Sequence, residues 1–196
     1  KLVDAEESRV YAKLAYESYS QSVGSARILR RAEFLTHFAA NVPIICRDDE
    51  LIVGSQRFTA PPFGEMFTEE QLQRVEIHGN HGHIVVDYGR VVQDGIPGLR
   101  QAIAAMPESE NRTAFAMSLE AFATFVSRHG FPELTERAPV SFHEALQLTW
   151  FVQIFLSVEG LGSAISFGRL DRFLWPFLDA DMRAGRCTLE EAFEMV

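Results

Sequence analysis

Three histidines and two glycines lie within six residues, in the segment His78-Gly79-Asn80-His81-Gly82-His83. An imidazole titrates near neutral pH and glycine lets the backbone come close to a ligand, so this segment is a candidate for acid/base chemistry. We expect His83 to carry that chemistry, because the apolar residues Ile84-Val85-Val86 that follow it would anchor it in the interior. A polar turn between two helices is the structural alternative.

The same three rings could instead converge on a metal ion, since spacings of three and two residues in a loop allow it. The segment holds no Cys, Asp or Glu that would complete a ligand set, and Asp87 is better placed as the N-cap of a following helix. We therefore predict no metal site, and keep a His-loop metal protein as a third hypothesis that elemental analysis would decide.

A second candidate is the small-residue stretch from Gly162 to Arg169. The hydroxyls of Ser163 and Ser166 could face a substrate, and their small neighbours leave room for one. A tight buried turn is the alternative, and the residues alone favour it. Arg169 and Asp171 are predicted to form a structural ion pair rather than a carboxylate clamp.

Composition limits the classes of partner. The chain has 18 Lys plus Arg against 27 Asp plus Glu, a formal net charge of -9, which argues against nucleic acid and anionic membranes as partners. Its most apolar run, 146–158, is shorter than the ~20 residues that a bilayer requires. Two distant cysteines and no secretory segment favour a cytoplasmic protein, and both chain ends look cut.

The apolar periodicity and capping signals predict a mainly α chain with a few short strands. Two β-branched runs, 43–46 and 51–54, are expected to form extended segments or a hairpin. The helix that opens with Ser141 is the most hydrophobic and should be buried centrally. Helices are expected at about 4–19, 25–42, 68–76, 87–95, 97–106, 109–129, 141–158, 171–184 and from 188.

Four motifs follow one another along the chain: Ile28–Ala32 with Pro43-Ile44 and Arg47–Ser55, then Gly82–Val91, Ser141–Phe151 and Ser166–Phe177. In this order they resemble the N-terminal region of the glycyl radical enzymes related to pyruvate formate-lyase, which include glycerol and diol dehydratases and decarboxylases. The resemblance implies that residues 1–196 are the N-terminal part of a pyruvate formate-lyase-like domain.

In the complete enzyme the resemblance implies a ten-stranded α/β barrel within a helical shell, a radical stored on a C-terminal glycine, and a central cysteine that abstracts hydrogen from substrate. This chain has no R-V-x-G-Y loop, and neither Cys46 nor Cys187 lies in a G-C-x-E setting. We therefore expect no cofactor in this chain. The implied partners are a small-molecule substrate, a radical SAM activating enzyme that installs the glycyl radical, the remainder of the enzyme or a second subunit, and a second copy in a homodimer.

The resemblance also assigns roles to residues. It implies that His83 is an acid/base group near a departing hydroxyl, and that Ser163, Ala164 and Phe167 line the substrate pocket. Alanine at 164 cannot hydrogen-bond a polyol hydroxyl, which argues against glycerol or propanediol as substrate. The path from Ser55 to Asn80 is also shorter than in the family.

We therefore expect the N-terminal portion of a radical lyase, dehydratase or decarboxylase acting on a small oxygenated substrate. The alternative is a truncated, non-catalytic family member that serves as a binding or partner module.

Overall fold

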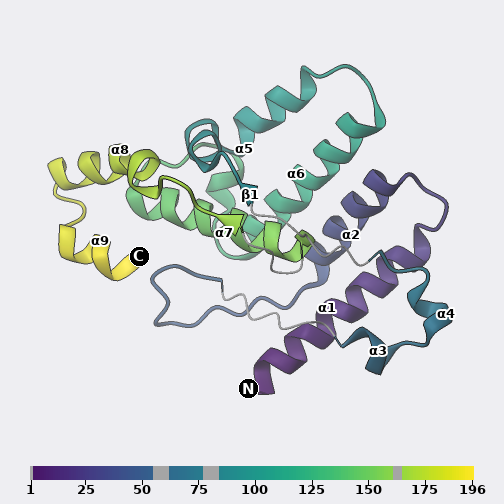
Figure 1. The fold of residues 1–196 in the computed structure, drawn as a ribbon. Coiled ribbons are helices and arrows are strands. Elements are labelled where there is room, and N and C mark those ends of the chain that lie inside the picture. Colours follow the sequence, from purple (N-terminus) through teal and green to yellow (C-terminus); the bar gives the residue numbers. More distant parts are fainter. Residues whose placement is uncertain (1, 55–61, 77–83, 161–164) are drawn as a thin grey trace.

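Residues 2–54, 62–76, 84–160 and 165–196 are described by the computed structural model, and they form a mainly helical structure with one short pair of strands (Figure 1). The front part of the chain contains α1 (Leu2–Gln21), α2 (Arg27–Asn41), α3 (Phe63–Met66), α4 (Glu69–Leu72) and β1 (Ile84–Val85). The back part contains α5 (Tyr88–Ala104), α6 (Glu110–Arg128), the 3-10 helix η1 (Pro132–Thr135), α7 (Phe142–Gly160), β2 (Ile165–Ser166), α8 (Leu170–Arg183) and α9 (Leu189–Met195).

Helix α7 lies at the centre, as its all-round hydrophobicity predicts. Leu148, Phe151 and Val158 are fully buried on it, and Phe151 meets Phe125 of α6 edge to face at 5.8 Å between ring centroids. Helices α1, α2 and α6 pack with α7 in the main core. A smaller cluster joins the start of α7 to α5, α8 and α9. The prediction of a mainly α chain with a few short strands is therefore confirmed.

Local capping chemistry sets several helix boundaries where the sequence predicts them. The Asp87 carboxylate accepts from the Arg90 amide at 3.1 Å, and the Ser109 hydroxyl accepts from the Arg112 amide at 3.2 Å. Thr68 and Thr188 each form a complete capping box. Gly130 follows α6 with a φ of 92°, as a C-terminal glycine should.

Three expectations about elements need correction. Helix α1 begins at Leu2, so Asp4 lies inside the helix rather than at its N-cap. The predicted helices on either side of Gly95 form one element, α5, with a kink at that glycine. Residues 43–54 form neither a helix nor a strand, with a turn at 48–49 and bends at 51–52, so the expected hairpin is not found. Side chains of α7 rather than a second strand satisfy part of their backbone.

Strands β1 and β2 run parallel, with Ile84 paired to Ile165 and Val85 to Ser166. They are 80 residues apart in sequence, and the connection between them passes through α5, α6, η1 and α7. A helical crossover between parallel strands is the unit from which α/β barrels are built. None of the helices in the described part of the chain is long and apolar enough to cross a membrane.

Candidate functional site

The candidate site lies where the chain enters the two paired strands. Because β1 and β2 are parallel and paired in register, the chain enters both strands from the same end. The residues that precede them, His83 before β1 and Ser163-Ala164 before β2, lie outside the described residues, so their assigned roles stay predictions.

Phe167 directly follows β2 and is half-buried against Tyr88, with the ring centroids 5.6 Å apart. Tyr88 is fully buried at the start of α5, and its hydroxyl donates to Oε1 of Gln153 on α7 at 2.5 Å. The Gln153 amide in turn donates to the Ile165 carbonyl at 3.5 Å. These hydrogen bonds connect the start of β2 to α5 and α7, and the Phe167 ring packs against Tyr88, one of the residues that form them.

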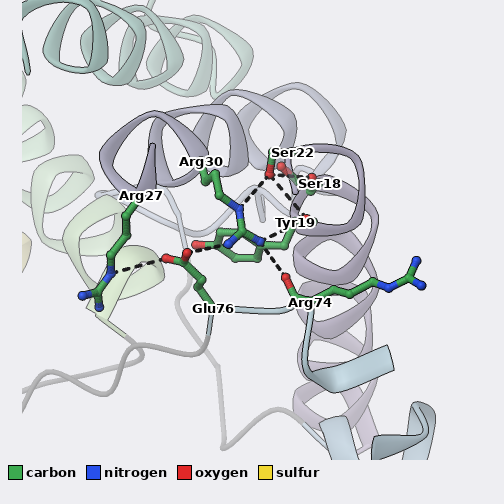
Figure 2. A network of polar contacts seen from close by, with 7 residues as sticks. All are labelled: Ser18, Tyr19, Ser22, Arg27, Arg30, Arg74 and Glu76. Atoms are coloured by element: carbon green, nitrogen blue, oxygen red, sulfur yellow. Dashed lines mark hydrogen bonds and ion pairs between the residues drawn. The ribbon is translucent and has the colours of Figure 1, made fainter. Parts of the chain in front are cut away.

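An ion-pair network holds the chain just before the His/Gly segment (Figure 2). The Arg30 guanidinium bonds Glu76 at 2.5 Å and donates to the carbonyls of Tyr19 at 3.2 Å and Arg74 at 2.7 Å. Arg27 contacts the other oxygen of Glu76 at 3.4 Å. Only 13% of the Arg30 side chain and 19% of the Glu76 side chain are exposed, so this pair is better shielded from water than a surface pair. The network therefore fixes residues 74–76 to α1 and α2.

A row of polar side chains on α7 holds residues 53–54. Gln147 is fully buried; its amide oxygen accepts from the Val53 N–H at 2.8 Å and its amide nitrogen donates to the Val53 carbonyl at 2.8 Å. One turn along, the Trp150 indole donates to the Gly54 carbonyl at 2.5 Å. The side-chain amide thus takes the place of a strand partner for Val53.

Sequence reasoning missed this row. The sequence predicts a centrally buried helix here, and Gln147 enters that prediction only within the motif Ser141–Phe151. The available signal was the spacing of Gln147, Trp150 and Gln153, three hydrogen-bonding side chains three residues apart on a largely apolar helix.

The remaining polar predictions concern ordinary structural roles. Arg169 and Asp171 form the predicted ion pair, at 2.7 Å, with both side chains mostly exposed. His37 contacts Glu17 at 3.1 Å, and His143 contacts the Leu51 carbonyl at 2.8 Å. His129 is buried and bonds the Phe125 carbonyl at 2.7 Å. All three of these helical histidines thus have hydrogen-bond partners.

Neither cysteine has an activated thiol. Burial raises the pKa of the Cys46 thiol, and Glu50 raises it further. Burial likewise raises the pKa of Cys187. A thiol with a raised pKa holds less thiolate at neutral pH. Among the described residues no group of three or more His, Cys, Asp and Glu side chains could hold a metal ion; the histidines of 78–83 lie outside them.

Comparison with known proteins shows which family the chain resembles. The model of the pyruvate formate lyase-like family matches residues 133–196. The chain is 24% identical over 280 aligned positions to a probable dehydratase, YbiW, of Escherichia coli K12, covering 92% of this chain and 34% of that protein. It is also 42% identical over 57 residues to the isethionate sulfite-lyase of Nitratidesulfovibrio vulgaris, covering 29% of this chain and 7% of that protein.

The fold agrees with the sequence matches. A crystal structure of a glycyl radical enzyme from Archaeoglobus fulgidus superposes with a TM-score of 0.72 at 22% identity, covering 94% of this chain and 36% of that one. The resemblance to the glycyl radical enzymes related to pyruvate formate-lyase is thus confirmed. More particularly, its relatives include proteins named as a dehydratase and a sulfite-lyase.

The matches also show how the length of this chain compares with the lengths of its relatives. The chain spans about a third of the relatives that it matches along nearly its full length. The 280 aligned positions exceed the 196 residues of the chain, so that relative carries additional residues within the matched region. This agrees with the expectation that part of the chain is shortened relative to the family.

Proposed function

We propose that residues 1–196 are the N-terminal part of a pyruvate formate-lyase-like domain in a glycyl radical enzyme that eliminates or cleaves a small oxygenated substrate. The reaction class is that of a lyase, dehydratase or decarboxylase. The names of the relatives support this class, since they include a probable dehydratase, isethionate sulfite-lyases and a 4-hydroxyphenylacetate decarboxylase subunit.

One observation carries the proposal. The parallel pairing of Ile84 with Ile165 brings together the strands that directly follow the two segments predicted to form the site. These segments are far apart in sequence, and a shared entry end is what a common pocket requires. We therefore assign the acid/base role to His83, and the pocket wall to Ser163, Ala164 and Phe167.

The chemistry of these side chains is simple. A protonated His83 would give its proton to a departing hydroxyl, which then leaves as water, and the neutral ring would accept a proton in the reverse direction. Ser163 would offer one hydroxyl for orientation, whereas Ala164 offers none, so the substrate needs no hydrogen bond at that place.

The radical steps belong to other residues. The cysteine that abstracts hydrogen and the glycine that stores the radical would come from the remainder of the enzyme, in the same polypeptide or a second subunit. The proposal therefore includes a radical SAM activating enzyme, a homodimer, and a cytoplasmic, anaerobic setting in which such a radical survives.

The test is His83→Ala in the full-length, activated enzyme, with His81→Ala as the matched control from the same segment. We expect His83→Ala to abolish turnover while electron paramagnetic resonance detects the same amount of glycyl radical, because the acid/base group acts after activation. Unimpaired turnover in His83→Ala would remove the assignment. So would an equal loss in both variants, because it would point to the segment rather than the ring.

The alternative carried over from the sequence is a non-catalytic family member that binds a ligand or partner chain. The two candidates differ in what the natural gene encodes. A longer reading frame, or a neighbouring one that supplies the R-V-x-G-Y loop, would favour the enzyme. A folded 196-residue product without either would favour the module.

A further inference from the structure

A cavity of about 250 Å³ lies between the first half of α1, the end of α2, the end of α6 and the middle of α7. Most of its wall is apolar and comes from Val10, Phe38, Val42, Pro43, Ile45, Phe125 and Ile154. An apolar cavity of about 150 Å³ is already large enough to bind benzene, so this one has room for an aromatic ring with a small substituent. None of its lining residues belongs to the site proposed above.

Four polar residues also line the cavity, and three of them have their polar groups satisfied elsewhere. Tyr11 donates its hydroxyl hydrogen to the Val158 carbonyl at 3.0 Å and makes a further interaction, and Glu7 also has an interaction partner. Glu6 is exposed, so water solvates its carboxylate. The hydrogen bonding that the cavity offers to a ligand therefore depends on the fourth residue, His129.

His129 carries a hydrogen-bond acceptor. Its Nδ1 lies 2.7 Å from the Phe125 carbonyl, which has no hydrogen to give, so Nδ1 carries the ring proton and Nε2 bears a lone pair. The residue is only 8% exposed, and burial lowers its pKa, which keeps the ring neutral at pH 7.

The lone pair of Nε2 is available to a ligand. Within the described part of the chain, Nε2 has no hydrogen-bond partner. It is also not among the side-chain atoms that are both fully enclosed and unpartnered, so it is open to the space that its ring lines. A buried ring nitrogen that accepts no hydrogen bond has a free-energy cost, which a donor in the cavity would remove.

This arrangement selects the chemistry of a ligand. A charged group would lose its hydration against a mostly apolar wall, whereas a neutral hydroxyl loses little and donates one hydrogen bond. An ether of the same shape has no hydrogen to give to Nε2. Phe38 and Phe125 favour an aromatic body, since aromatic rings pack well against one another.

We propose that this cavity binds a small neutral aromatic molecule of the phenol class, whose hydroxyl donates to Nε2 of His129. The site is independent of the proposed glycyl radical chemistry, because it uses other residues. Binding there forms and breaks no covalent bond.

The probes are phenol and anisole, which share one ring and differ in that anisole has no hydroxyl hydrogen. Each is titrated into the purified protein, and nuclear magnetic resonance of the backbone amides gives its Kd. We expect phenol to bind and to move the nitrogen resonance of Nε2 strongly, because a hydrogen bond engages its lone pair. Anisole should move that resonance much less. No binding of phenol, or the same Nε2 shift with both probes, would overturn the proposal.

Variants then locate the hydrogen bond. His129→Phe keeps a ring of similar shape without the lone pair, and should lower the ratio of the anisole Kd to the phenol Kd about tenfold. His37→Phe on α2 removes a histidine outside the cavity and should leave the ratio unchanged. An unchanged ratio in folded His129→Phe would exclude His129 as the acceptor.

A third variant tests the cavity itself. Val10→Phe on α1 fills part of the space without changing any charge, and should weaken the binding of both probes at least tenfold. Circular dichroism checks that each variant is folded. Full binding of phenol by folded Val10→Phe would show that the ligand binds elsewhere.

Discussion

At the scale of single residues, Gln147 carries a structural role that its motif did not reveal. The oxygen and the nitrogen of its side-chain amide each form a hydrogen bond of 2.8 Å with the backbone of Val53. The side chain is fully buried. If these two hydrogen bonds were lost without replacement, the N–H and C=O groups of Val53 would be left unsatisfied, and each unsatisfied group costs free energy.

We therefore predict that Gln147→Leu lowers the free energy of unfolding by about 2–4 kcal/mol. Gln101→Leu, at an exposed position of α5, should change it by less than about 0.5 kcal/mol. Urea denaturation of the two variants measures both values. Similar stabilities would show that the amide clamp on Val53 contributes little.

A second residue-scale prediction concerns His129 and pH. Burial lowers its pKa below the ordinary value of 6.5, and the charge of Arg128 lowers it further. As the pH falls below about 6.5, the unfolded chain therefore takes up a proton that the folded protein does not, and stability decreases.

His129→Phe keeps an aromatic ring between Phe125 and Phe151 but cannot titrate. We expect its free energy of unfolding to fall less than that of the natural protein between about pH 7.5 and pH 5.5, as measured by urea denaturation. An equal fall in both proteins would mean that His129 is not the group responsible.

At the scale of elements, the kink in α5 depends on Gly95. Its φ is 64°, and a Cβ added there would lie 2.7 Å from the Cα of Ala138. Gly130 also has a positive φ, of 92°, but no atom lies within 4 Å of its added Cβ. A substitution at Gly130 therefore tests backbone strain alone, whereas one at Gly95 tests backbone strain together with steric overlap.

We predict that Gly130→Ala lowers the free energy of unfolding by about 1 kcal/mol, the cost of the left-handed conformation alone. Gly95→Ala should lower it by at least about 1–3 kcal/mol more, because the backbone around Ala138 must also move. Thermal or urea unfolding distinguishes them. The kink would not need glycine if both variants lost the same stability.

The Arg30–Glu76 network belongs to the same scale, since it joins residues 74–76 to α1 and α2. Arg30→Gln leaves a poorly exposed carboxylate without its closest cation. We expect a loss of about 2 kcal/mol or more and faster amide exchange at 74–76. Arg9→Gln breaks the exposed pair with Glu65 and should lose less than about 1 kcal/mol. Unchanged exchange in Arg30→Gln would contradict the anchoring role.

The elements show which features the sequence could predict. The sequence predicts four helix starts correctly from their N-cap residues, which are Thr68, Asp87, Ser109 and Thr188. It can do so because a cap is a local interaction between residues three apart. The hydrogen-bond partner of residues 51–54 was not predicted. That partner is α7, more than ninety residues away in sequence, and no local pattern encodes such a contact.

At the scale of the whole molecule, the motif order predicted the class of protein correctly. The matched relatives and the helical fold with one parallel strand pair agree with it. The individual motifs proved to serve packing and anchoring as much as chemistry, as Arg30, Gln147 and Trp150 demonstrate. The structural roles of these motif residues are seen only in the structure, because each contact joins segments far apart in the sequence.

The central claim is that the residues before β1 and β2 form one site, and cross-linking tests it most directly. Cys46 and Cys187 are first replaced by Ser, and His83→Cys and Ser163→Cys then provide two thiols. A bifunctional methanethiosulfonate reagent about 8 Å long forms a disulfide with each thiol only if the two positions lie close together. The control protein contains the natural Cys187, which lies between α8 and α9, and one introduced cysteine, His83→Cys (Figure 1). The account predicts an efficient intramolecular cross-link, seen by mass spectrometry, between positions 83 and 163 and little in the control. No cross-link between 83 and 163, or one no more efficient than the control, would contradict it.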